Sequence, residues 1–131
     1  MAEAFDVSLL PFAGLMGVEI AHAASDRVEG TLLVRPELCT AGGVLHGGAI
    51  MALADSLGAV GAFLSTPAGW RTTTLESKTN FIGSARTGTT VKAVSTPLHT
   101  GRRTSVWTTR IEGAEGKLVA VVTQTQMTVE V

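Results

Sequence analysis

The chain has 131 residues, which suits one domain spanning residues 1–131 with a core of its own. Its formal net charge of −1 argues against a general nucleic-acid binder. Hydrophobic residues make up 45% and charged residues only 16%, so we expect a partner subunit to cover some apolar surface. The single Cys39 excludes an internal disulfide framework, and the N-terminal residues do not resemble a signal peptide, so we expect a cytoplasmic protein.

The first third of the chain predicts a short helix followed by two strands. Residues 5–16 are mixed apolar and fit a short helix or lid that Pro11 breaks. Apolar and polar residues then alternate in the strand-like stretch 18–34, where Ser25-Asp26 fits a hairpin turn. We expect residues 38–43 to form a loop.

Residues 47–64 predict one long helix that is apolar on nearly all sides and therefore largely buried. Gly58 and Gly61 lower its helix propensity, so we expect another element to approach the helix closely at these positions. The apolar run is interrupted by Asp55 and is shorter than the about 20 apolar residues of a membrane span. We therefore expect no insertion into a membrane.

The remainder of the chain is typical of β-structure, because threonine and valine are abundant and turn signals recur. The predicted strands are residues 72–81, 90–98, 104–111 and 118–129. With two strands before the helix and four after it, one antiparallel sheet of about five to six strands must wrap a single central helix. This order defines an α+β fold.

Asp55 is the only formally charged side chain between Glu37 and Arg71, and it lies in the middle of the apolar helix. A carboxylate in such surroundings is costly to bury unless it is paired or used. Gly47 and Gly48 open the same helix, where backbone N–H groups are free to bind a developing negative charge. The segment therefore predicts a catalytic carboxylate and an oxyanion hole.

The segment 44–58 resembles the hotdog-fold acyl-CoA thioesterases of the phenylacetate-type and dihydroxynaphthoyl-CoA-type (PaaI-like) group. Their signature is His-Gly-Gly, a short apolar stretch and an acid, which are here His46-Gly47-Gly48 and Asp55. Further similarities, at residues 14–17, 80–88, 97–101 and 106–107, extend the resemblance over nearly the whole chain. It implies a hotdog fold, hydrolysis of acyl-CoA thioesters without a metal or other cofactor, and a homodimer with shared active sites, often a dimer of dimers.

The spacing of the helix residues supports a shared site independently. Gly47 and Asp55 are eight residues apart, which is about 12 Å along a helix, so one thioester carbonyl group cannot contact both in one subunit. Two such helices packed antiparallel about a two-fold axis bring Gly47 of one chain near Asp55 of the other. Asp55 then activates a water or attacks the carbonyl carbon itself, and the N–H of Gly47, with Gly48 as a second donor, binds the oxygen. The sequence leaves both routes open.

Further site residues follow from the resemblance. His46 belongs at the start of the helix, where it either orients the loop or takes part in catalysis. Thr40 stands where relatives commonly carry Asn or Gln, and Ala59 stands where aryl-CoA relatives often use Ser or Thr. Thr73 or Thr74 on the next strand could supply the missing hydroxyl group, although threonine is also simply a good strand residue.

Coenzyme A, as part of the substrate, needs cations and N–H donors for its phosphate groups. The resemblance places the nucleotide end of coenzyme A at two turns between strands, and the alternative is that their side chains are only solvated. The candidate residues are Ser84, Arg86, Thr100, Gly101, Arg102 and Arg103.

Two other functions remain open. A hotdog hydroxyacyl dehydratase usually needs a catalytic His in a different motif, and a non-catalytic acyl-CoA binding or sensing module could keep the fold while losing the acid. Retention of Asp55 favours the thioesterase.

We expect the acyl pocket to be lined by Met51, Leu53, Leu57 and Val60 together with the N-terminal segment of a neighbour. Aryl, phenylacetyl and medium-chain acyl groups all fit the sequence.

Overall fold

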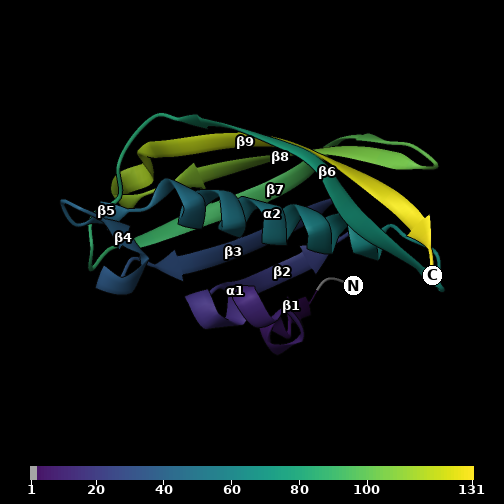
Figure 1. Ribbon diagram of the computed structural model, residues 1–131, viewed down its shortest axis with the longest axis horizontal. Coiled ribbons are helices and arrows are strands. Elements are labelled where there is room, and N and C mark those ends of the chain that lie inside the picture. Colours follow the sequence, from purple (N-terminus) through teal and green to yellow (C-terminus); the bar gives the residue numbers. More distant parts are fainter. Residues whose placement is uncertain (1–2) are drawn as a thin grey trace.

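A computed structural model describes residues 3–131 and shows one long helix lying along a curved antiparallel sheet (Figure 1). The helix, α2, spans Gly47–Leu64, as the sequence predicts. The strand order in the sheet is β1-β2-β3-β7-β8-β9-β6. The strands are β1 (Glu3–Phe5), β2 (Glu19–Ala24), β3 (Arg27–Leu33), β6 (Trp70–Phe81), β7 (Thr90–Thr100), β8 (Thr104–Glu112) and β9 (Leu118–Glu130). The predicted α+β architecture is confirmed, with six longer strands and the three-residue β1.

The N-terminal segment differs from the prediction at Pro11. A 3₁₀-helix, η1 (Val7–Leu9), precedes a separate α-helix, α1 (Pro11–Met16). Pro11 is the first residue of α1, where its fixed φ suits the helix and its missing N–H leaves no bond unmade. Pro11 therefore begins a helix instead of breaking one.

Residues 38–43 are not a simple loop. After the 3₁₀-helix η2 (Pro36–Leu38), the strands β4 (Cys39–Thr40) and β5 (Val44–Leu45) form a small hairpin of their own. The N–H of Leu45 donates to Ala85 O at 2.8 Å, and the N–H of His46 donates to Leu38 O at 2.9 Å. The first bond ties the segment before α2 to the loop between β6 and β7, and the second ties it to η2. A third 3₁₀-helix, η3 (Ala114–Gly116), joins β8 to β9.

The core lies between α2 and the concave face of the sheet. Leu53 and Leu57 of α2 are fully buried, and they share one apolar cluster with fully buried residues of the strands: Val28, Leu32, Val91, Ala93, Ile111, Val119, Ala120 and Val122. By length and composition, α2 is long and apolar enough to cross a membrane, as the buried helix of a protein core can also be. Here the helix packs on its own sheet. The hydrophobic cluster accounts for its composition.

The close approach predicted at the two helix glycines is confirmed. A Cβ atom at Gly61 would lie 2.3 Å from the indole ring of Trp107, which is fully buried in β8. A Cβ atom at Gly58 would lie 2.5 Å from the side-chain amide carbon of Gln124 in β9. No side chain fits at either position without a shift of its neighbour, so both glycines allow β8 and β9 to pack tightly on α2.

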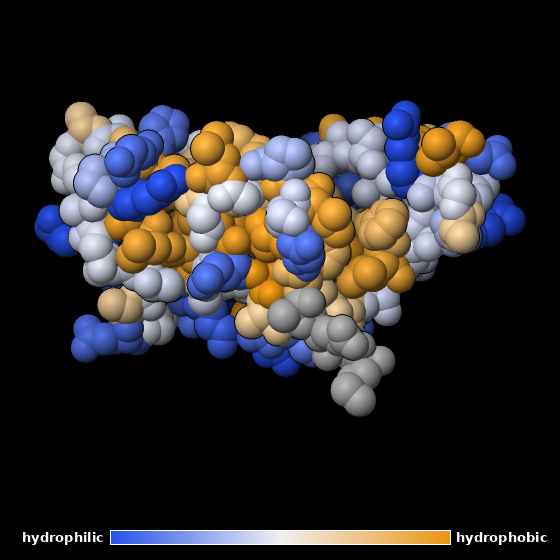
Figure 2. All heavy atoms as spheres, turned by 90° about the horizontal axis from the view of Figure 1, so that it is seen from below, coloured by the Kyte–Doolittle hydropathy of each residue, from blue (hydrophilic) through white to orange (hydrophobic). Residues whose placement is uncertain are grey.

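Apolar side chains also gather on the outside of the molecule. Figure 2 views the molecule from below relative to Figure 1 and shows apolar residues across the middle of that face, the side on which α1 lies. Leu9, Phe12 and Leu15 are among the exposed large apolar side chains, each more than 60% accessible. Exposed apolar surface of this kind is typical of an interaction site, which keeps the prediction of a partner subunit in place.

Candidate active site

The start of α2 carries one uncommitted backbone donor. His46 is the N-cap, and its Nδ1 accepts a 2.7 Å hydrogen bond from the N–H of Gly48. The N–H groups of Ala49 and Ile50 donate to the carbonyl oxygen of His46. Within residues 3–131, the N–H of Gly47 has no acceptor. Of the two predicted oxyanion donors, Gly47 is therefore available, whereas the N–H of Gly48 is occupied by the cap.

Phe81, the last residue of β6, lies beside this donor. A Cβ atom at Gly47 would lie 3.1 Å from Cε1 of the Phe81 ring, so the glycine leaves room for the aromatic ring next to the helix start. Phe81 is 55% exposed. The partial positive charge of the 18-residue helix is strongest here, which makes the site attractive to an anion.

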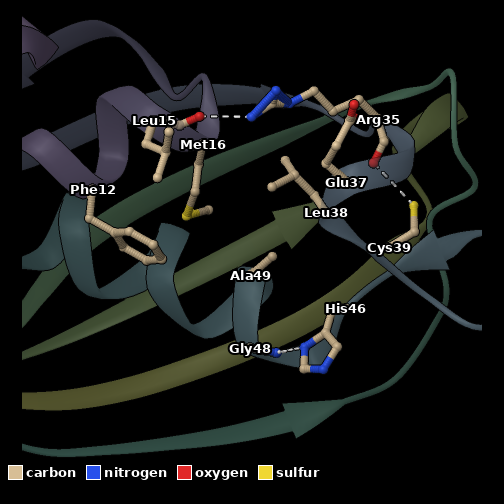
Figure 3. A pocket seen from close by; sticks show the side chains of 10 residues that line it. All are labelled: Phe12, Leu15, Met16, Arg35, Glu37, Leu38, Cys39, His46, Gly48 and Ala49. Carbon is tan, nitrogen blue, oxygen red and sulfur yellow. Dashed lines mark hydrogen bonds between the residues drawn. The ribbon is translucent and has the colours of Figure 1, made fainter.

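A pocket of ≈ 590 Å³ opens next to the helix start, between α1 and the segment that leads into α2 (Figure 3). Arg35 closes one side, where its Nη2 donates to Leu15 O at 2.7 Å. The lining residues are mostly apolar: Phe12, Leu15, Met16, Arg35, Glu37, Leu38, Cys39, His46, Gly48 and Ala49. Its size suits a small acyl group.

Asp55 is held by hydrogen bonds from the neighbouring strands. Thr74 Oγ1 in β6 donates to Asp55 Oδ1 at 2.6 Å, and Gln124 Nε2 in β9 donates to the same oxygen at 3.2 Å. Gln126 Nε2 in turn donates to Thr74 Oγ1 at 2.7 Å. Within residues 3–131, no hydrogen bond reaches Asp55 Oδ2. The carboxylate thus has one anchored oxygen and one free oxygen.

A smaller pocket of ≈ 400 Å³ lies over Asp55 on the outer side of α2. Ala59 lines it one turn after Asp55, and Phe12 lines both pockets. The other lining residues are Leu10, Pro11, Ala13, Ala52 and Ser56. Both openings therefore face the same outer side of α2, where α1 lies.

The prediction for the acyl pocket is wrong for three residues. Leu53 and Leu57 are fully buried and Val60 is 3% exposed, because all three point into the core beneath α2. Met51 is only half-buried. A helix that is apolar all round gives no sequence signal for which of its sides faces the sheet.

The predicted substrate-binding threonines separate in the structure. Thr74 contacts Asp55, whereas Thr73 is exposed, because successive side chains of a strand point to opposite faces of the sheet. Thr40 is exposed in β4, and its neighbour Cys39 lines the larger pocket instead.

The predicted coenzyme A residues form two groups at opposite ends of β6. Ser84 and Arg86 follow its end, and Arg86 forms a β-bridge with Val44 near the start of α2. Thr100 ends β7, and Gly101, Arg102 and Arg103 follow it in the turn to β8, where the two arginines line a pocket with Pro67, Trp70 and Thr128. The 12 residues of β6 span about 36 Å at about 3.3 Å per residue, so one phosphate group cannot contact both groups in one protomer.

The sequence analysis did not identify Gln124 and Gln126. They lie on the same face of β9 as the fully buried Val122, but the adjacent Val121 is equally apolar, so period-two patterning alone does not show that the glutamines face inward. Their contact with the Asp55 network has no local signal. Among residues 3–131, no three His, Cys, Asp or Glu side chains group so as to hold a metal ion.

A single helix wrapped by an antiparallel sheet, with a glycine-rich helix start and a carboxylate farther along the helix, defines a hotdog-fold protein. The pattern of the thioesterase superfamily matches residues 42–120, and the chain belongs to this family. It is 36% identical to the 1,4-dihydroxy-2-naphthoyl-CoA hydrolase of Escherichia coli over 105 residues, which cover 80% of this chain and 76% of that enzyme.

Solved structures agree. A thioesterase of Haemophilus influenzae superimposes with a TM-score of 0.85 at 31% identity, covering 91% of this chain and 82% of that one. The PaaI protein of the E. coli phenylacetic acid degradation operon shares the fold with a TM-score of 0.83, at 21% identity and over 91% and 84% of the two chains. The chain is thus a hotdog-fold thioesterase of the PaaI-like group.

Proposed function

We propose that the chain hydrolyses the thioester bond of a small aromatic or medium-chain acyl-CoA at a site shared between two protomers. Asp55 of one protomer is the general base or nucleophile, and the N–H of Gly47 of its partner binds the thioester oxygen. The observation that carries the proposal is the pair of uncommitted groups on α2, the N–H of Gly47 and Oδ2 of Asp55.

Each of the two groups has a chemical task. Asp55 Oδ2 either takes a proton from a water that attacks the carbonyl carbon or attacks that carbon itself, giving an anhydride that water opens. The negative charge that develops on the carbonyl oxygen is stabilised by the N–H of Gly47 and the positive end of α2. Collapse of the tetrahedral intermediate breaks the C–S bond and releases coenzyme A as a thiolate, which is weakly basic and needs no strong general acid.

The edge of the sheet supports the dimer. β6 is the last strand of the sheet and presents an unpaired edge among the described residues. The outer side of α2 carries the small residues Gly48, Ala52 and Ala59, which let a second helix approach closely. Antiparallel pairing of two β6 strands places two α2 helices side by side in opposite directions, as the shared site requires. A dimer of dimers belongs to the same proposal.

This pairing also reconciles the two groups of coenzyme A residues. In an antiparallel β6 pair, the Trp70 end of one strand lies beside the Phe81 end of the other. Arg102 and Arg103 of one protomer then lie near Ser84 and Arg86 of its partner. We assign the nucleotide end of coenzyme A to this combined basic surface.

The acyl group is proposed to lie in the apolar pocket beside the helix start, against Phe12 and Leu15. An aromatic or medium-chain acyl group fits its mostly apolar lining. The similar 1,4-dihydroxy-2-naphthoyl-CoA hydrolase is named for an aromatic substrate, which supports the same class here. Nothing in the proposed steps uses a cofactor, and coenzyme A takes part only as a portion of the substrate. We also propose that the enzyme is cytoplasmic.

The first test is thiol release from a panel of aromatic and aliphatic acyl-CoA esters by the wild type and Asp55→Asn. We expect Asp55→Asn to lower kcat by about 10³-fold or more while the melting temperature and the oligomeric state stay unchanged. Asp26→Asn, in the exposed turn between β2 and β3, is the matched control and should leave kcat unchanged. A folded Asp55→Asn protein with near-wild-type turnover would exclude Asp55 as the catalytic group, and binding without any turnover by the wild type would favour a binding module.

The second test addresses the shared site by mixing two inactive variants. Gly47→Pro removes the N–H, and proline is accepted at the first helical position; Gly47→Ala keeps the N–H and controls for the added Cβ atom. In a mixed dimer of Gly47→Pro and Asp55→Asn protomers, one of the two sites is intact. We expect activity to return on mixing. If the protomers exchange but activity does not return, the N–H of Gly47 and the carboxylate of Asp55 act together within one protomer.

The third test addresses the basic surface. Arg102→Ala and Arg103→Ala should raise KM for coenzyme A esters more than they lower kcat, because they remove binding that is equal in the ground and transition states. Arg110→Ala, an exposed arginine of β8, is the control. An unchanged KM in both variants would remove the turn between β7 and β8 from the binding site.

A further inference from the structure

We propose that Gln126 and Gln124 are positioning residues that, with Thr74, hold Asp55 by one oxygen and so dedicate Oδ2 to the reaction. This inference rests on the proposed role of Asp55. It goes beyond that role because it assigns a task to two residues that line neither pocket and so act on the reaction only through Asp55. The chain of bonds runs from Gln126 Nε2 to Thr74 Oγ1 and from Thr74 Oγ1 to Asp55 Oδ1.

The direction of the hydroxyl proton in this chain is fixed. An ionised carboxylate only accepts hydrogen bonds, and a threonine hydroxyl group has a single proton to donate. Thr74 Oγ1 accepts a 2.7 Å hydrogen bond from Gln126 Nε2, so the hydroxyl proton of Thr74 is not used in this contact. It points along the 2.6 Å contact to Asp55 Oδ1.

The scaffold holds both glutamine amides in place. Gln124 and Gln126 are 0% and 1% exposed, and Gln126 is the direct cross-strand partner of Thr74. A β-bulge in β6 follows Thr74, and bulges commonly re-aim a side chain next to an active site. The carboxylate selects the amide orientation, because an amide oxygen turned toward Asp55 would be repelled.

Gly58 is part of the same arrangement. Gln124 Nε2 lies 3.2 Å from Asp55 Oδ1 and 3.5 Å from the Asp55 carbonyl oxygen, so the amide bridges the side chain and the backbone of α2. A Cβ atom at Gly58 would lie 2.5 Å from the amide carbon and would displace it. The glycine therefore gives Gln124 access to the carboxylate.

The position of the donors assigns different roles to the two carboxylate oxygens. Both donors, Thr74 and Gln124, reach Oδ1, and among residues 3–131 none reaches Oδ2. Asp55 lines the pocket on the outer side of α2, opposite the strands that hold Oδ1. Oδ2 is thus the oxygen that meets water or the thioester carbon.

The cost of this network argues for a function. The amide oxygens of both glutamines are buried and have no partner within the described residues, which is destabilising compared with an apolar pair. Apolar side chains at 124 and 126 would continue the hydrophobic face of β9 that Ala120 and Val122 begin. Glutamine at both positions is explained by the hydrogen bonds it donates, from Gln124 directly to Asp55 and from Gln126 to Thr74.

The test is a double-mutant cycle in steady-state kinetics. Thr74→Val keeps the shape and removes the hydroxyl group, and we expect kcat to fall by about tenfold or more, as for a lost hydrogen bond to a charged group, with KM changed less than about twofold. Gln126→Met should lower kcat by a smaller factor, about threefold. Because Gln126 acts only through Thr74, adding Gln126→Met to Thr74→Val should lower kcat no further.

Two controls and one replacement variant make the result specific. Thr74→Ser restores a hydroxyl group and should regain most of the kcat lost in Thr74→Val. Thr109→Val removes the buried hydroxyl bond from Thr109 to Ser95 (3.0 Å) away from Asp55, and it should change the melting temperature but not kcat. Gln126→Asn, which shortens the side chain but keeps it polar, replaces Gln126→Met if that variant does not fold.

The outcomes separate this inference from the proposed function. If Thr74→Val and Gln126→Met lower the melting temperature but leave kcat unchanged, or if their effects on kcat multiply, the positioning role is overturned. If Asp55→Asn itself retains turnover, the proposed function fails first. Loss of kcat in Asp55→Asn with unchanged kcat in the network variants would reject the positioning role alone.

Discussion

Two sides of α2 pack on the sheet, and each meets fully buried residues, but they differ in chemistry. Toward β3, Leu57 of the helix packs against the backbone at Gly30. A Cβ atom added at Gly30 would lie 3.3 Å from Leu57 Cδ1. Toward β6 and β9 it packs Asp55 and Gly58 against Thr74 and Gln124. Burial alone therefore does not identify the functional side, whereas buried polar groups do.

The difference separates what stabilises the fold from what positions the chemistry. The apolar side is made of closely packed side chains whose removal from water drives folding. The polar side exchanges part of that stabilisation for fixed donors around a carboxylate. Variants on the two sides should therefore change different measured quantities, and the following predictions test this in order of expected effect.

The largest effect is expected on the apolar side. Leu57→Ala removes a fully buried side chain and leaves a cavity, so we expect the free energy of unfolding to fall by about 2–5 kcal/mol. The folded fraction should retain its kcat within about twofold. Chemical denaturation and active-site-normalised kinetics at low temperature measure both. A large loss of kcat in the folded Leu57→Ala protein would show that the two sides of α2 do not act separately.

The two helix glycines sharpen the same comparison. Gly61→Ala should lower the free energy of unfolding by about 1–3 kcal/mol, because the new Cβ atom meets the fully buried ring of Trp107. Thermal and denaturant unfolding should show this loss with kcat nearly unchanged. A stable Gly61→Ala protein would mean that Trp107 has room to move.

Gly58→Ala should behave in the opposite way. The new Cβ atom meets the amide end of Gln124 and turns it away from Asp55, and this cost is offset because alanine favours a helix over glycine by about 1 kcal/mol. We therefore expect little change in stability but a several-fold lower kcat, because the amide is displaced from Asp55. Equal losses of stability in Gly58→Ala and Gly61→Ala would remove the distinction between the two contacts.

The sequence predicts the scaffold well for physical reasons that are local. The apolar run with glycines at its start sets the bounds of α2, and the alternation of apolar and polar residues sets the inward face of β3, where Val28 and Leu32 are fully buried. The hairpin β4–β5 has strands of only two residues, too short for any periodicity to show. Its existence depends on bonds to the distant residues 85 and 86.

The candidate site is predictable only where its residues are close in the sequence. His46, Gly47 and Asp55 stand on one helix, so spacing relates them. Gln124 lies 69 positions from Asp55, and in the run Thr123–Gln126 either the threonines or the glutamines could face inward without the rest of the sheet. Choosing between Thr73 and Thr74 likewise requires the strand phase that the β6–β9 register fixes.

The smallest effect is expected at His46, where the sequence left a structural and a catalytic role open. His46→Ala removes the side-chain acceptor of the Gly48 N–H, and the loss of an N-cap typically costs about 0.5–2 kcal/mol of stability. His46→Asn restores a strong capping side chain. If capping is the whole role, His46→Asn should regain both the melting temperature and kcat. Recovery of the melting temperature without kcat would mean that the imidazole ring, which lines the larger pocket, also contacts the substrate.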